Sequence, residues 1–312
     1  MKIVAIVLTY NEEKHLERCI ASLSGVVDEI AVVDCFSSDG TLDIARKNNA
    51  RIFQHTWTNH ATQFNWALTQ LDAGPDWVLR IDADEYLTDE LRKEIKDSLP
   101  NIGDVDGVNF NRRMTFQGKR IRYGGVFPVK VLRLFRFGRG LCENRWMDEH
   151  IKVQGKTVDF QGELIDDNLS TLTWWTDKHN SYASREAIDL LNLEYNFMAH
   201  DSVADLRKGA QAGLKRWIKE KVYARLPRGF RAFAYFFYRY VVRFGFLDGR
   251  EGTAFHFLQG FWYRYLVDAK IMEVKRYMQK QEIGIENAIE EVLGIKISPT
   301  MAKETAPQLT GR

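Results

Sequence analysis

The chain contains few cysteines and few prolines for its length. Three cysteines, Cys19, Cys35 and Cys142, and six prolines are spread over 312 residues. The cysteines are too few for a disulfide framework and lack the spacing of a metal site, so both are excluded. Such sparse use of cysteine fits a reducing compartment, and we expect a cytoplasmic protein.

Long apolar runs are also missing. No uncharged hydrophobic stretch approaches the roughly 18 residues that a membrane-spanning helix requires. A strand pattern starts at residue 2, so we expect no signal peptide. The length of 312 residues is sufficient for one α/β domain and a smaller helical domain.

Charge is nearly balanced, with 44 Lys and Arg against 42 Asp and Glu, but it is unevenly distributed. Residues 112–145 contain ten basic side chains and one acid, and residues 206–243 contain eleven and one. Such runs form either a solvated basic face or a surface that meets phosphate or anionic lipid. No recognised nucleic-acid-binding motif accompanies them, so we expect no nucleic-acid partner.

The first 82 residues alternate between apolar runs and helical patterns. The apolar runs, typical of strands buried on both faces, cover residues 2–8, 29–33, 51–53 and 77–81. This alternation predicts an α/β fold with a Rossmann-like, mostly parallel sheet. Because such crossovers are right-handed, Thr9, Asp34 and Asp82 should lie on one rim of the sheet.

Asp82-Ala83-Asp84 is the most informative motif. It follows a buried strand directly, at the end where open α/β sheets bind ligands. Two carboxylates one residue apart can reach one hard cation or one ribose, and magnesium and manganese prefer oxygen ligands. Capping or a solvated loop is the alternative for an isolated D-x-D. Its position after several strand–helix units favours a metal–nucleotide diphosphate site.

Three segments together resemble the family-2 glycosyltransferases. They are residues 4–12, residues 32–34 with 38–41, and residues 81–85, in the family's order and spacing. The resemblance covers roughly the first 165 residues and implies the A-type glycosyltransferase fold. Residues 1–165 are therefore expected to form a nucleotide-sugar-binding catalytic domain, whose commonest donor is a uridine diphosphate sugar.

Later segments resemble the branch of that family which builds lipopolysaccharide core and related envelope glycans. These are residues 123–128, 132–136 and 245–252. The branch implies a lipid-linked or polysaccharide acceptor. It often carries Val-His-Glu where this chain has Met147-Asp148-Glu149, with a histidine following at His150.

The resemblance also implies roles for single residues. It assigns Thr9, Asp34 and Asp39 to the nucleotide-sugar pocket. Asn11 and Glu12, at the same rim, and Asp82 are expected to complete it. Asp84 is expected to bind a divalent cation, manganese or magnesium, directly, while Asp82 contacts the ribose or shares the metal. Structural capping is the alternative role for Asp39 and Asp34.

The acceptor hydroxyl must lose a proton as it attacks the anomeric carbon, and a carboxylate can accept it. Asp148-Glu149-His150 is the acid–acid–histidine cluster that follows the D-x-D. We favour Glu149 as the base, with Asp148 as the alternative. His150 is either a further metal ligand or a hydrogen-bonded core histidine. The family resemblance implies inversion at the anomeric carbon.

The second half of the chain reads as helical. Helical patterns cover residues 181–198, 205–224, 228–244, 254–280 and 285–293. Residues 166–297 are therefore expected to form a helical acceptor-binding or membrane-associating region. The polar residues 298–312 are expected to be a disordered tail.

The helix expected over residues 228–244 has two contrasting faces. On a helical wheel, Arg228, Arg231, Arg239 and Arg243 gather on one side and aromatic residues on the other. This pattern is typical of a helix that lies in a membrane interface, although an aromatic face packed into a core is the alternative. We therefore expect a peripheral protein that meets anionic lipid on the inner face of the cytoplasmic membrane.

Two other functions fit parts of the sequence. A nucleotidyltransferase uses a related sheet and an acidic metal site, but it usually has a glycine- and arginine-rich phosphate loop, which residues 9–13 are not. A non-catalytic nucleotide-sugar-binding module would have no need for the base at Glu149. Slow metal-dependent hydrolysis of a donor would distinguish an enzyme from such a module.

Overall fold

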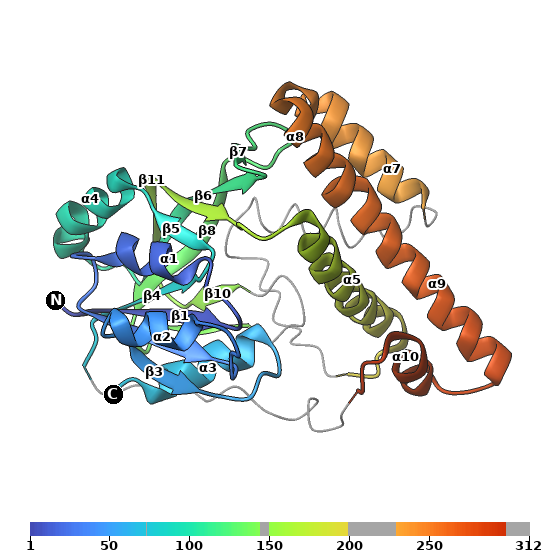
Figure 1. Cartoon of the computed structure of the whole chain (residues 1–312), viewed down its shortest axis with the longest axis horizontal. Coiled ribbons are helices and arrows are strands. Elements are labelled where there is room, and N and C mark those ends of the chain that lie inside the picture. Colours follow the sequence, from blue (N-terminus) through green and yellow to red (C-terminus); the bar gives the residue numbers. More distant parts are fainter. Residues whose placement is uncertain (73, 144–149, 199–228, 298–312) are drawn as a thin grey trace. The chain divides into compact units, whose positions relative to one another are not determined.

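The computed structural model describes residues 1–72, 74–143, 150–198 and 229–297 (Figure 1). They form two compact units, one from Met1 to Ser170 and one that begins at Thr171. The predicted boundary at residue 165 lies within the last strand of the first unit. The helix expected over residues 205–224 and the tail 298–312 lie outside the described residues.

The first unit is built on a nine-stranded sheet. Its strands are β1 (Ile3–Thr9), β2 (Glu29–Asp34), β3 (Arg51–Gln54), β4 (Trp77–Asp82), β5 (Glu85–Leu87), β6 (Gly107–Phe116), β7 (Lys119–Arg120), β8 (Val129–Arg136) and β11 (Thr157–Asp167). They are ordered β3-β2-β1-β4-β8-β6-β11-β5, with β7 paired to β6. Strands β9 (Gly140–Cys142) and β10 (Ile151–Val153) form a separate antiparallel ribbon.

The α/β fold class is confirmed, and the sheet is mixed rather than parallel throughout. Strands β3, β2, β1 and β4 are mutually parallel, as predicted. Strand β8 runs antiparallel to both β4 and β6, whereas β11 is parallel to β6. No helix lies between β6 and β8 in the described chain, and strands joined by short connections can pair only antiparallel.

Four helices cover the two faces of this sheet. They are α1 (Leu16–Leu23), α2 (Thr41–Lys47), α3 (His60–Gln70) and α4 (Asp89–Ser98). Alternate residues of β1 enter different cores: Ala5 and Val7 pack with α1, α2 and α4, while Val4 and Ile6 pack with α3. Burial on both faces explains why this strand is almost entirely apolar.

The second unit is helical, as predicted. Its elements are α5 (Leu172–Tyr195), α7 (Phe230–Phe237), the π-helical turn η4 (Tyr238–Val242), the 3₁₀ turn η5 (Gly245–Asp248), α8 (Gly249–Phe255), the π-helical turn η6 (His256–Trp262), α9 (Tyr263–Gln281) and α10 (Ile285–Leu293). Within the described part of the chain, no helix is long and apolar enough to cross a membrane.

Only part of the basic face expected on the helix over residues 228–244 is found. Arg231 and Arg239 are buried inside the second unit rather than displayed on a basic face. Arg231 donates to both carboxylate oxygens of Asp268 in α9, at 2.8 and 2.9 Å from its Nε. A helical wheel separates the two faces of a helix but does not say which face is buried. Here the ion pair with Asp268 holds Arg231 on the buried side. Arg228 lies outside the described residues.

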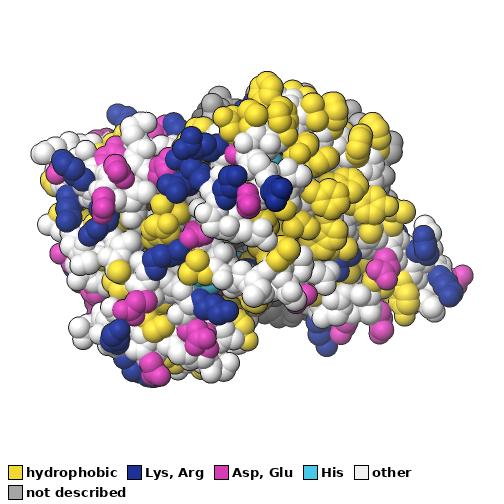
Figure 2. Space-filling view, turned by 45° about the horizontal axis from the view of Figure 1, so that its top comes forward, with side chains coloured by type: hydrophobic (Ala, Val, Ile, Leu, Met, Phe, Trp, Pro, Cys, Tyr) yellow, Lys and Arg dark blue, Asp and Glu magenta, His cyan; other side chains and the backbone are white. Residues whose placement is uncertain are grey.

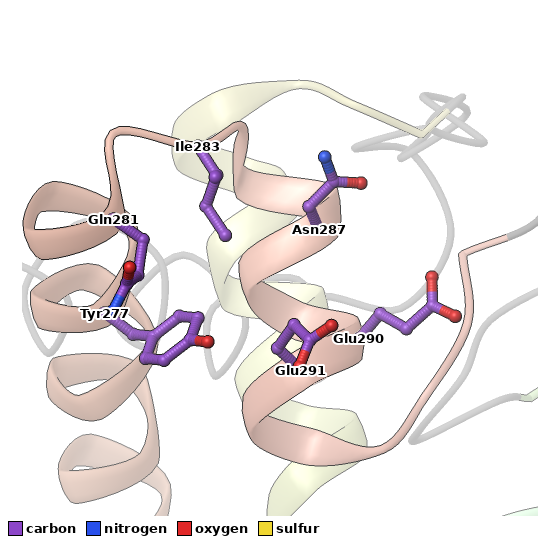
Figure 3. Close-up of a pocket in the computed structure, with 6 residues that line it drawn as sticks. All are labelled: Tyr277, Gln281, Ile283, Asn287, Glu290 and Glu291. Atoms are coloured by element: carbon purple, nitrogen blue, oxygen red, sulfur yellow. The ribbon is translucent and has the colours of Figure 1, made fainter.

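A cavity of about 380 Å³ lies at α9 and α10 in the second unit (Figure 3). It is lined by Tyr277, Gln281, Ile283, Asn287, Glu290 and Glu291. None of the residues that the sequence predicts for catalysis or nucleotide binding lines it. The functional site must therefore be sought at the rim of the sheet in the first unit.

Candidate active site

The carboxyl ends of three parallel strands bring the predicted residues to one rim. Thr9 at the end of β1 pairs in register with Asp34 at the end of β2. On the other side of β1, Leu8 pairs with Asp82 at the end of β4. The predicted common rim of Thr9, Asp34 and Asp82 is therefore confirmed.

Asp34 is fully buried beneath this rim and is held by hydrogen bonds. Its carboxylate accepts from the Thr9 hydroxyl at 3.0 Å and from the Ser37 backbone N–H at 2.8 Å. The Gln54 amide donates to it at 3.4 Å. These contacts tie the ends of β1, β2 and β3 together, so Asp34 fixes the shape of the rim in this structure.

Asn11 and Asp39 connect the loops that follow β1 and β2. Asn11 adopts a left-handed backbone (φ 55°), and its Oδ1 accepts from the Ser38 N–H at 2.9 Å. Asp39 accepts from the backbone N–H groups of Thr41 at 3.0 Å and Glu13 at 3.2 Å. Burial opposes ionisation of Asp39, but the hydrogen bonds from Thr41 outweigh it and lower its pKa.

Glu12 links the rim to the far end of β11. Its Oε2 lies 2.6 Å from Nδ1 of the buried His15. Nε2 of His15 in turn accepts from the backbone N–H of Leu169 at 2.8 Å. Two exposed aromatic side chains, Tyr10 and Phe36, stand beside these residues at the same rim.

The D-x-D motif forms the tight turn between β4 and β5, and its two aspartates have different partners. Asp82 accepts from Arg133 Nη2 at 2.9 Å, and its other oxygen lies 3.8 Å from Arg80 Nε. Arg133 also donates to the buried Glu85 at 2.5 Å. Asp82 is therefore neutralised by arginines from β4 and β8.

Asp84 has no ion-pair partner among the described residues. Its Oδ2 accepts a hydrogen bond from Asn168 Nδ2 at 3.0 Å. The backbone carbonyl of Asp84 accepts from the Asp167 N–H at 3.1 Å, which fastens the turn to the end of β11. A half-buried carboxylate, oriented by an amide and lacking a protein cation, is chemically suited to a hard metal ion.

The acids around this turn differ in how readily they ionise. Burial tends to raise the pKa of Asp82, but the charges of Arg133 and Arg80 outweigh it and hold the pKa well below its usual value. Burial raises the pKa of Glu85 to about 8, and the nearby Asp82 and Asp166 reinforce this effect. Burial, with the charge of Asp84, raises the pKa of Asp166 to about 6.

His150 is not brought together with the two aspartates. Across the described ranges, no group of three or more His, Cys, Asp and Glu side chains that could hold a metal is present. The imidazole is exposed, and its Nδ1 lies 3.4 Å from Glu143. Glu143 also pairs with Lys152 at 2.8 Å, so His150 lies in the ion-pair network of the β9–β10 ribbon.

The predicted bases Asp148 and Glu149 lie outside the described residues, but the ribbon that flanks them is well defined. The backbone N–H of Glu143 donates to the carbonyl of His150 at 3.0 Å, which joins the two ends of segment 144–149. Next to Glu143, Sγ of Cys142 lies 3.4 Å from Arg80, the arginine beside Asp82. The strand that precedes the segment is thus connected to β4 through Cys142 and Arg80.

Four of the ten basic residues of the first run pair with acids of β11. The ion pairs that join it to this strand are Arg112–Asp166, Arg113–Glu163, Arg120–Glu163 and Lys130–Asp159. Cross-strand pairing of opposite charges is favourable on a sheet, and it leaves less free positive charge than the sequence suggests.

Sequence reasoning missed three residues that shape the site. Arg133 lies within the segment 132–136 that carried a family resemblance, and this was the one available signal for it. Arg80 is an isolated charge in an apolar strand, which is unusual enough to indicate a buried partner. Nothing local connects Asn168 with Asp84, because they are 84 residues apart in the chain.

Several known proteins are similar to this chain in sequence. The family model described as "Glycosyl transferase family 2" matches residues 4–143. An uncharacterized glycosyltransferase of Rickettsia prowazekii is 38% identical over 207 residues, which cover 61% of this chain and 68% of that protein. The lipopolysaccharide core biosynthesis glycosyltransferase LpsC of Rhizobium meliloti is 31% identical over 190 residues, which cover 59% and 69%.

Two more matches differ in how much of each chain they cover. An uncharacterized glycosyltransferase of Rickettsia typhi is 28% identical over 300 residues, covering 95% of this chain and 94% of that protein. A solved structure of glucosyl-3-phosphoglycerate synthase from Mycobacterium tuberculosis is 23% identical, with a TM-score of 0.30. That match covers 36% of this chain and 44% of the synthase.

Proposed function

The chain belongs to glycosyl transferase family 2 and is a glycosyltransferase, and on that premise we propose that it is metal-dependent and inverting. The proposed donor is a nucleoside-diphosphate sugar, with a uridine diphosphate sugar as the first candidate. The proposed acceptor is a lipid-linked or envelope glycan. Family membership also sets aside the nucleotidyltransferase and the non-catalytic binding module.

The contrast between the two aspartates of the D-x-D carries this proposal. Asp82 is neutralised by Arg133 and Arg80, whereas Asp84 has an amide partner and no described ion-pair partner. Asp84 is therefore the proposed direct ligand of a manganese or magnesium ion, and Asp82 would contact the ribose or share the ion. When bound, the cation would neutralise charge that develops on the departing diphosphate.

The rim of β1 and β2 supports the proposed nucleotide pocket. Asp34 and Thr9 lie inside the rim and set its shape, while Asn11, Glu12 and Asp39 fix the loops above them. We propose that these loops receive the nucleoside, because ligands of open α/β sheets bind beyond the carboxyl ends of the strands. The rigid hydrogen-bonded loops would bind the donor with little loss of conformational entropy.

Glu149 is the proposed base that takes the proton from the acceptor hydroxyl, with Asp148 as the alternative. The ends of their segment are joined by the Glu143–His150 hydrogen bond, and the neighbouring Cys142 lies 3.4 Å from Arg80. The proposal requires that this base deprotonate an acceptor hydroxyl that approaches the donor sugar from the side opposite the diphosphate. Attack from that side displaces the diphosphate directly and inverts the anomeric carbon.

The proposed setting is the cytoplasmic face of a membrane. The name of the Rhizobium meliloti relative refers to lipopolysaccharide core biosynthesis, which supports an envelope-glycan acceptor for this chain. Lipid-linked acceptors are presented at a bilayer surface. An enzyme that uses them benefits from its own contact with anionic lipid.

Donor hydrolysis tests the proposal directly. We expect the full chain to release nucleoside diphosphate slowly from one nucleotide sugar in a panel, and only with manganese or magnesium present. The same nucleotide sugar should raise the thermal unfolding midpoint. A ligand at about a hundred times its dissociation constant adds roughly 2.7 kcal/mol to the free energy of unfolding. Absence of both effects across the panel, or full hydrolysis in a chelator, would contradict the proposal.

A further inference from the structure

A continuous apolar stripe is exposed on the second unit. The stripe runs along α7 and η4 at helical spacing and consists of Phe230, Phe233, Phe237, Val241 and Phe244. Phe230 is 58% exposed and Phe233 is 53% exposed, although aromatic side chains are normally largely buried. Figure 2 shows hydrophobic side chains gathered over a broad area of this unit. Contiguous apolar areas of this kind mark sites of interaction.

The turn that follows η4 extends the stripe. Phe246 and Leu247 of η5 are exposed in this turn. Phe257 of η6 and Tyr265 of α9 are exposed as well. The ring of Phe236 contacts those of Phe257 and Phe261 at centroid distances of 6.2 Å, so the elements share one aromatic layer. The stripe and these four side chains are called the aromatic surface below.

The turn is held rigidly, so its exposed side chains are not a consequence of loose packing. A Cβ on Gly245 would lie 2.7 Å from the His256 ring, and one on Gly252 would lie 2.1 Å from the Asp248 Cβ. Both glycines therefore allow η5 to pack tightly against α8 and η6. Phe244 adopts a left-handed backbone (φ 58°), which is uncommon for an aromatic residue, and its side chain is 55% exposed.

The charges of residues 230–250 are sorted by sign. Arg231 and Arg239 are buried, the former paired with Asp268 and the latter bonded to Gln259 at 3.0 Å. The single acid, Asp248, is also buried, 3.4 Å from His256. Arg243 and Arg250 remain exposed on either side of the turn. Every exposed charge in this segment is therefore positive.

We propose that the aromatic surface inserts into the interfacial region of an anionic lipid bilayer, with Arg243 and Arg250 meeting the headgroups. Aromatic rings suit the boundary between headgroup and acyl chain, and arginine keeps its charge in the headgroup layer. A second copy of the chain fits less well, because a symmetric contact would oppose two patches whose exposed charges are all positive.

This inference rests on the proposed function for its purpose, since a lipid-linked acceptor would be met at the same bilayer. The sequence suggested that a basic face attaches the protein to the membrane, whereas the proposed attachment is by insertion of the aromatic surface. Two of the four arginines that the wheel placed on a basic face, Arg231 and Arg239, are buried and support the fold from inside. Insertion of apolar side chains, together with the exposed Arg243, is proposed to supply the binding. Binding should therefore survive partly at high salt, which screens headgroup attraction but not burial of apolar surface.

Vesicle flotation of the full chain tests the inference without any nucleotide sugar. Wild type should float with phosphatidylcholine–phosphatidylglycerol vesicles at low salt and retain part of this binding at high salt. Phe233→Ser with Phe237→Ser should lower the partition coefficient at least about tenfold, because burial of two large apolar side chains is lost. The matched control is Leu193→Ser, which changes an equally exposed apolar residue of α5 and should float as wild type does.

Several outcomes would overturn the inference. One is a wild-type chain that ignores anionic vesicles, and another is equal flotation of the double variant. A third is that wild type does not bind vesicles and is a dimer by light scattering, while the double variant is a monomer. This result would assign the surface to contact with a second copy. Donor hydrolysis measured in solution separates the two proposals, because the double variant should release nucleoside diphosphate at the wild-type rate.

Discussion

Nη2 of Arg133 lies 2.9 Å from Oδ2 of Asp82, so the first aspartate of the D-x-D has a permanent counter-ion supplied by another strand. The same guanidinium reaches Glu85, and both Arg133 and Glu85 are buried. One arginine of β8 thus holds the turn between β4 and β5 in place. The second aspartate, Asp84, accepts from the Asn168 amide and is the proposed ligand of the cation.

Arg133→Met should destabilise the chain by about 3 kcal/mol in urea unfolding, because Asp82 loses its nearest counter-ion and the buried Glu85 loses its hydrogen-bond donor. Glu85→Gln should destabilise the chain less, because burial already raises the pKa of Glu85 to about 8 and a neutral amide oxygen can still accept from Arg133. The variant that carries both changes should lose less free energy of unfolding than the sum of the losses in the two single variants. Additive losses would show that the two side chains do not act as a pair.

Asp84→Asn keeps the shape of the side chain and removes its charge. We expect transfer and metal-dependent donor hydrolysis to fall at least about a hundredfold, the scale of losing several kcal/mol of charge stabilisation. The thermal midpoint should stay near that of wild type. The control, Asp97→Asn, removes an exposed acid from α4 and should leave activity unchanged. Near-normal activity of Asp84→Asn would overturn its role as metal ligand.

Asn168→Ala removes the amide that orients Asp84. Residues that orient a metal ligand typically contribute 10- to 100-fold to metal affinity, so half-maximal hydrolysis should need at least about tenfold more manganese. The matched control is Asn109→Ala, which removes a similar amide–aspartate contact between β6 and β11. An equal effect of both variants would point to general loss of stability.

Glu149→Gln should cut turnover by about a hundredfold or more while donor binding changes little, as expected when a general base is lost. Asp148→Asn should have the smaller effect. Single-turnover transfer and donor titration measure the two quantities separately. A larger loss in Asp148→Asn would move the proposed base by one residue.

His256 should make the chain less stable in acid. Burial, reinforced by Arg239, lowers its pKa from 6.5 to about 4, although Asp248 acts in the opposite direction. Between these values the unfolded chain binds a proton that the folded chain does not, so stability falls as pH decreases from 6.5 to 4. The full loss is about 3 kcal/mol. Urea unfolding across this range should show a shallower pH dependence in His256→Gln than in wild type.

The sequence by itself determined the strand–helix alternation, the common rim of Thr9, Asp34 and Asp82, and the family. Hydrophobic periodicity is a local property of the sequence, and it identifies the strands. Where those strands are parallel, their carboxyl ends meet at one edge of the sheet. It determined in addition that residues 230–244 have an arginine face and an aromatic face. All these features depend on residues that are close in the chain, or on strands whose order follows a general rule of handedness.

Tertiary structure alone decided how those features are used. Arg133 pairs with Asp82 from 51 residues away, and Asn168 bonds to Asp84 from 84 residues away, so no local pattern distinguishes the two aspartates. The mixed half of the sheet follows from connections too short for crossovers. The buried Asp268 draws Arg231 inward and leaves the phenylalanines of α7 exposed, because a carboxylate in α9 offsets the cost of burying a guanidinium there.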